Sequence, residues 1–301
     1  MKRRTIFLST AFILIYCGVC PAQIVEVDGV ELTTTKAPWK LRIPGNDLDI
    51  ADVKVKPDEQ SAYFMMTSES SKLTVSVFIE PVDKCKTSEE CRDYVLNLGN
   101  PKWGKFQDLT KSKIKDFSYF EFYRPEFDGH PLKMFDMYVE YVDQGYWVDL
   151  HISKALYSKE DHVLFEKVIK AISFVAKDKP VTSTYDSAMA DGEKAAATWL
   201  GLWDKMKCLE SYTNLSQLTR ADIPEKLWIK YCQETNDALG QNRSRKLVAS
   251  AFTKGRPPKT DRPLAILAYH SSFTNSPSGV DLVALLLETN GSWSVTNYLL
   301  R

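Results

Sequence analysis

An aspartate and a histidine two positions apart are the first candidates for chemistry in this sequence of 301 residues. Asp149 and His151 belong to an alternating stretch, so in a strand their side chains share one face with that of Trp147. A carboxylate beside an imidazole can accept and deliver a proton near neutral pH. The alternative interpretation, which we favour, is a polar strand face that lies in water.

A second aspartate and histidine, Asp204 and His270, occur in the last third of the chain. Leu264, Ile266, Ala268 and His270 alternate along a predicted strand, so they share a face that could line a pocket beneath a helix. A carboxylate or an imidazole in such a pocket could act as a base. The alternative is a hydrogen-bonded histidine near a strand end and an aspartate at a helix exit.

Three tryptophans are candidates for ligand binding. Trp199 and Trp203 lie four positions apart on one face of a predicted helix, and Trp228 lies in the next helix. Large aromatic side chains could line a ligand pocket. At this spacing, however, such residues more often form the core of a domain.

A basic stretch between positions 243 and 262 supplies a second set of binding candidates. It holds seven basic residues against one acidic residue, Asp261. Arg243, Arg245 and Arg256 could therefore contact an acidic protein or another anionic component of the cell envelope. The alternative is a solvated strand edge, where positive charge discourages aggregation between sheets.

Composition and motifs exclude several classes of function. The sequence has 39 basic and 39 acidic residues, which argues against a nucleic-acid partner. It has no glycine-rich dinucleotide motif, no Walker loop, no HExxH and no GxSxG. We therefore expect no cofactor and no metal ion, and we favour a protein that is not an enzyme.

Positions 1–22 have the composition of an export signal. Three basic residues at positions 2 to 4 precede about ten apolar residues, too few to span a bilayer comfortably. Small residues at Cys20 and Ala22 place the predicted cleavage after Ala22. An uncleaved anchor and a lipoprotein modified at Cys17 or Cys20 are the alternatives. The sequence thus predicts a periplasmic or secreted protein with no transmembrane segment in its mature chain.

Four cysteines remain after the predicted cleavage. An oxidising compartment favours two disulfides, for which three pairings exist. Spacing favours Cys85 with Cys91 and Cys208 with Cys232. Four thiolates around a zinc ion would be the alternative, but the CxxC spacing of such sites is missing.

Residues 23–175 form the first of two predicted units. Leu73–Ile79 alternates apolar and polar residues as a half-buried strand does. Thr87 and Glu90 form a capping box that opens a helix to about Leu98. Further strands are expected at Trp39–Ile43, Tyr63–Thr67, Phe117–Tyr123, Met134–Val142 and Trp147–Ile152, and a second helix after Ser158.

The order of strands and helices in this unit predicts an α+β fold with an antiparallel sheet. WKLRIPG, YFMMTSESSKLTVSVFIEP and YWVDLHIS followed by EDHVLFEKVIKAISF resemble PsbP-like proteins. That resemblance implies an α/β/α sandwich that binds or assembles with partners.

Residues 176–186 are predicted to be a linker, and residues 187–301 to be the second unit. Gly192–Met206 is expected to be an amphipathic helix, Tyr212–Arg220 is polar and expected to be irregular, and a second helix begins after Asp222. Four strands should follow, at Lys246–Thr253, Leu264–Phe273, Val280–Thr289 and Trp293–Leu300. Asn290 and Gly291 favour a tight hairpin between the last two.

This second unit resembles the bacterial domain-of-unknown-function family numbered 4019. The resemblance rests on AAATWLGLWD, Trp228, LGQNRSR and NGSWSVTNYLL. It implies a cystatin-like cone of helices on a curved antiparallel sheet, in an envelope protein. We therefore expect a non-enzymatic binding protein whose partner is an unknown protein or an anionic envelope component. The alternative is a small-molecule enzyme that uses a pocket in the cone.

Overall fold

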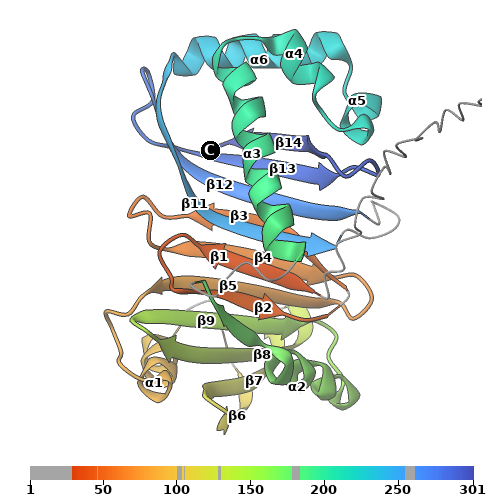
Figure 1. Cartoon of the computed structure of the whole chain (residues 1–301). Coiled ribbons are helices and arrows are strands. Elements are labelled where there is room, and N and C mark those ends of the chain that lie inside the picture. The colour runs from red at the N-terminus through yellow and green to blue at the C-terminus, as the bar shows by residue number, and fades with distance from the viewer. Residues whose placement is uncertain are drawn as a thin grey trace, which may run out of the picture.

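The computed structural model describes residues 29–45, 47–99, 104, 106–127, 130–177, 184–254 and 262–301. The predicted export signal with its cleavage site after Ala22, and the binding candidate Arg256, lie outside these residues. The fold is α+β as predicted, with two seven-stranded antiparallel sheets (Figure 1).

Sheet 1 is built only from strands of the first predicted unit. Its order is β3 (Leu48–Val55), β4 (Ala62–Ser68), β5 (Leu73–Pro81), β9 (Tyr146–Lys154), β8 (His130–Asp143), β7 (Phe117–Phe127) and β6 (Gln107–Ile114). The alternation in β5 has the predicted effect, since Leu73, Val75, Val77 and Ile79 are all buried.

Sheet 2 combines strands from both ends of the chain. Its order is β10 (Ser173–Ala176), β2 (Trp39–Ile43), β1 (Val30–Thr34), β11 (Asn242–Lys254), β12 (Pro263–Phe273), β13 (Gly279–Leu287) and β14 (Trp293–Leu300). Strand β1 pairs with β11 from Val30 opposite Thr253 to Thr34 opposite Ala249. The two predicted units therefore share one hydrogen-bonded sheet.

The helices lie on the outer faces and at the ends of the sheets. They are α1 (Ser88–Leu98), α2 (His162–Ala171), α3 (Thr184–Asp204), α4 (Cys208–Thr213), α5 (Gln217–Asp222) and α6 (Glu225–Leu239), with a short 3-10 turn, η2 (Lys159–Asp161), before α2. Helix α1 begins as predicted, with the Thr87 side chain accepting a hydrogen bond from the Glu90 amide. Figure 1 shows α3 running across the strands of sheet 2, while α1 and α2 lie beside β7 and β8.

Three expectations for the region around α3 were wrong. The helix begins at Thr184, inside the predicted linker, and ends at Asp204. Met206 lies beyond the helix with a φ of 55° and is exposed, so it does not extend the apolar face. Positions 212–220, expected to be irregular, lie mostly within α4 and α5.

Three apolar clusters hold these layers together. One lies between the two sheets and includes Leu41 of sheet 2, Leu150 of sheet 1 and Phe165 of α2. A second lies between α3, α4, α6 and the outer face of sheet 2. The third joins α1 to the outer face of sheet 1. Side chains alternate between the two faces of strand β12, so one face contributes to the cluster between the sheets and the other contributes to the cluster beneath the helices.

Candidate ligand-binding cavity

The three candidate tryptophans fill the space between the helices and sheet 2. Trp199, Trp203 and Trp228 are 3%, 0% and 4% exposed, and the Trp203 ring lies 5.5 Å from that of Trp199 and 5.7 Å from that of Trp228. Trp199 Nε1 donates to the carbonyl of Ser211, and Trp228 Nε1 donates to its hydroxyl, each at 3.0 Å. These tryptophans therefore pack as core residues of the described part of the chain.

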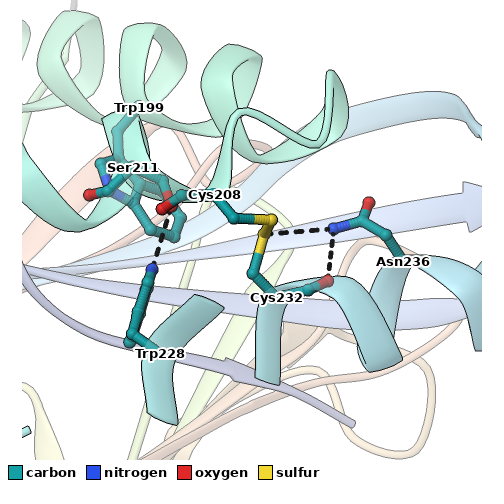
Figure 2. Close-up of a disulfide and its surroundings, with 6 residues drawn as sticks. All are labelled: Trp199, Cys208, Ser211, Trp228, Cys232 and Asn236. Atoms are coloured by element: carbon teal, nitrogen blue, oxygen red, sulfur yellow. Dashed lines mark hydrogen bonds between the residues drawn. A yellow bond between two sulfur atoms is a disulfide. The ribbon is translucent and has the colours of Figure 1, made fainter. Parts of the chain in front are cut away.

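Both predicted disulfide pairings are confirmed. Cys85 is bonded to Cys91, and Cys208 is bonded to Cys232. Figure 2 shows the second bond joining α4 to α6 beside Ser211 and the tryptophans. This disulfide therefore fixes the two helices that close the tryptophan core.

Asp204 and His270 lie on opposite faces of sheet 2 and cannot act together. Asp204, at the end of α3, pairs with Arg245 on the helix side of sheet 2, whereas His270 Nδ1 is 2.8 Å from Glu59 Oε1, on the side of sheet 1. Tyr269, the next residue along β12, packs in the tryptophan core. The predicted alternation of this strand is correct, but the prediction that His270 faces the cone was wrong. The apolar neighbours of His270 face the other sheet.

Arg245 is largely buried in an ion-pair network and is not free to bind a partner. It donates to Asp204 at 2.6 and 3.1 Å and to Asp281 at 2.5 Å. Ser271 and Tyr298 also donate to Asp281, at 2.7 and 3.1 Å. Burial alone would lower the pKa of Arg245, but the hydrogen bonds and charges of the two aspartates raise it above its usual value.

Two other cations of the predicted basic stretch are also paired with carboxylates of this chain. Lys246 is paired with Glu59, and Arg262 is paired with Glu288. Arg243 is exposed. Carboxylates within the chain therefore hold these two cations as well as Arg245, and the attraction for an anionic partner stays a prediction.

Asp149 and His151 share a face of β9 with Trp147, as predicted, but that face does not lie in water. On this side of sheet 1, Trp147 is 5% exposed, and the neighbouring Asp136 and Glu140 are fully buried. His151 Nε2 lies 2.8 Å from Asp136 rather than against Asp149. The favoured interpretation as a solvated strand face was therefore wrong.

A largely buried carboxyl pair lies on this face, where Asp149 and Glu140 are directly opposite each other in the β8–β9 ladder. Trp147 Nε1 donates to Glu140 Oε2 at 2.6 Å, while Glu140 Oε1 and Asp149 Oδ1 have no partner among the described residues. Burial raises the pKa of Asp149 to about 6, and burial with the charge of Asp149 raises that of Glu140 well above its usual value.

A cavity of about 620 Å³ lies elsewhere, between β3 of sheet 1, helix α5 and strands of sheet 2. Its apolar floor comes from β12 and β13, and its walls come from α5, β3 and β14. The lining residues are Asp49, Ile50, Leu218, Thr219, Asp222, Ile223, Thr253, Leu264, Ile266, Ala284, Leu286, Thr296 and Asn297. No local pattern predicts this cavity, because its walls are far apart along the chain.

Hydrogen bonds hold the walls of the cavity against sheet 2. The Ser216 amide donates to the carbonyl of Val295 at 2.7 Å, and the Thr219 hydroxyl donates to that of Thr296 at 2.8 Å. The Thr253 hydroxyl donates to the carbonyl of Leu48 at the start of β3. These polar groups are thus used within the protein, so α5 and β3 are fixed walls around an apolar floor.

The described ranges contain neither a metal-binding cluster nor a membrane-spanning helix. No group of three or more His, Cys, Asp or Glu side chains there could hold a metal ion. Within the same ranges, no helix has the length and apolar character needed to cross a membrane.

Comparison with known proteins finds one family model that matches part of the chain. Residues 195–298 match the model of a family described as "Protein of unknown function (DUF4019)", which confirms the resemblance predicted for the second unit. No curated protein matches the chain.

Two solved structures are similar to the chain at low sequence identity. The solution structure of cyanobacterial PsbP (CyanoP) from Synechocystis sp. PCC 6803 covers 50% of this chain and 94% of its own, with 13% identity and a TM-score of 0.35. A crystal structure from Bacteroides thetaiotaomicron VPI-5482 covers 83% of this chain and 88% of its own, with 11% identity and a TM-score of 0.34.

Proposed function

We propose that this protein is an exported binding protein of the cell envelope and that the cavity between α5, β3 and sheet 2 holds its ligand. The observation that carries the proposal is the cavity itself. Its volume of about 620 Å³ falls within the usual size of small-molecule sites. Leu264, Ile266, Ala284 and Leu286 offer the ligand an apolar floor.

Binding accounts for the candidate residues better than catalysis in the cone does. An enzyme there would need an acid–base group facing an open pocket. Asp204 is instead tied to Arg245, and His270 lies on the other face of the sheet. The tryptophans occupy the interior that a substrate would need.

The disulfides support export. Disulfides persist in oxidising compartments outside the cytoplasm, and all four cysteines of the predicted mature chain are paired. Together with the composition of positions 1–22, they favour a periplasmic or secreted protein. The intact mass of the protein recovered from the periplasm or medium should correspond to a chain that begins at Gln23. A chain that retains positions 1–22 would contradict cleavage after Ala22.

Binding can be tested with an uncharged fluorescent probe, N-phenyl-1-naphthylamine, whose emission rises in apolar surroundings. Ala284→Phe places a large side chain on the cavity floor and should weaken probe binding by about tenfold or more. Ala197→Phe adds the same group on the exposed side of α3 and should leave binding unchanged. Equal binding by wild type and Ala284→Phe, with both proteins folded, would overturn the proposal.

A further inference from the structure

The charges around the cavity point to a class of ligand. Asp49 on β3 and Asp222 on α5 both line it, and no Lys, Arg or His is among its lining residues. Neither carboxylate forms an ion pair with a described residue. The two aspartates come from different walls but line the same cavity, so their negative charges act on one ligand site.

Basic residues that flank the lining do not cancel this charge. Arg262, just before the β12 floor, is paired with Glu288. Arg301 is paired with Asp52 at 2.8 Å. Arg220 lies two positions before Asp222 on α5, and residues two apart on a helix do not face each other.

We propose that the ligand is a small amphiphilic cation, with an apolar body and an ammonium group. This inference rests on the proposed function. The apolar body would cover the floor formed by Ile266, Ala284 and Leu286, while the ammonium group would lie between Asp49 and Asp222. An anion of the same size would be repelled by both carboxylates and would meet no cation in the lining.

The test compares two probes with equal chains, decyltrimethylammonium and decanoate, by calorimetric titration below their micelle-forming concentrations. We expect the cation to bind about tenfold tighter at low salt, because each partly exposed charge contributes a few-fold. Added sodium chloride should reduce this preference. Equal affinities, or tighter binding of decanoate, would overturn the inference.

Charge-removing variants assign the preference to the cavity. In the double variant Asp49→Asn with Asp222→Asn, the preference for the cation should fall to about twofold or less. Asp237→Asn removes an exposed carboxylate from α6, away from the lining, and should keep the full preference. An unchanged preference in the double variant would refute the role of these two aspartates.

The outcomes for charge and for the cavity are separate. Suppose that Ala284→Phe abolishes binding of the neutral naphthylamine, but the wild-type protein binds the two charged probes equally. The cavity is then the ligand site, and only the inference that its ligand is a cation fails. If Ala284→Phe leaves binding of the neutral probe and of the cation intact, the cavity is not the ligand site, and both proposals fail.

Discussion

Replacing Asp149 by asparagine should stabilise the protein at neutral pH. The pKa of Asp149 is raised from 3.8 to about 6 by burial, although the charge of His151 opposes that rise. One pKa unit corresponds to about 1.4 kcal/mol, so the ionised carboxylate costs the fold about 3 kcal/mol once the pH exceeds 6. The asparagine side chain does not ionise, and it is close to aspartate in shape.

The sign follows from the protons bound by each state. Between about pH 4 and pH 6 the folded state keeps the proton of Asp149 while the unfolded state has lost it, so this residue's contribution to stability falls as the pH rises. Asp149→Asn should therefore gain up to about 3 kcal/mol at pH 7 to 8 and almost nothing at pH 4. The charge of Asp149 also helps to raise the pKa of Glu140. Removing that charge therefore makes an ionised Glu140 less costly, which adds to the gain in stability.

Urea unfolding at several pH values, with the disulfides intact, measures this difference. Asp237→Asn is the matched control, because its exposed carboxylate should give an offset near zero at every pH. The free energy of unfolding of Asp149→Asn, relative to wild type, should rise between pH 4 and pH 7. A difference that is constant with pH, or a loss of stability at pH 8, would refute the reasoning.

Three further predictions concern the groups that hold the fold together. Arg245→Met leaves the buried Asp281 and the partly buried Asp204 without their cation and should lower the free energy of unfolding by about 3–5 kcal/mol in urea titrations; a loss under about 1 kcal/mol would contradict the network. The pair Cys208→Ser with Cys232→Ser should cost about 3 kcal/mol by the same assay, and an unchanged midpoint would contradict a stabilising bond. Trp203→Ala should cost about 3–5 kcal/mol because its ring is fully buried, and a negligible loss would mean that this space is not packed.

Local patterns predicted many of the elements but not all of their partners. The capping box of α1, the alternation of β5 and the last four strands were recognised because each signal lies within a few residues. The pairing of β1 with β11 joins residues at opposite ends of the chain and leaves no local trace. Strand β3 was missed because its alternation is interrupted by a bulge between Ile50 and Asp52.

The candidate site residues also depend on contacts that local sequence patterns do not reveal. Alternation put His270 on a face with Ile266, but it could not say which of two buried faces that was, because both sides of β12 are apolar. Likewise, the sequence showed the basic residues between positions 243 and 262 but not the carboxylates that pair with some of them, because those carboxylates are distant along the chain. Asp49 and Asp222 line one cavity only because the fold places β3 and α5, which are far apart in the sequence, beside the same strands of sheet 2.

The most direct test of the binding cavity is a methyl chemical-shift titration with N-phenyl-1-naphthylamine. The largest shifts should fall on Ile50, Leu264, Ile266 and Leu286, which line the cavity from both sheets. Leu150, buried between the sheets and outside the lining, should be nearly unaffected. Binding of the probe with shifts confined to residues outside the lining would contradict the account.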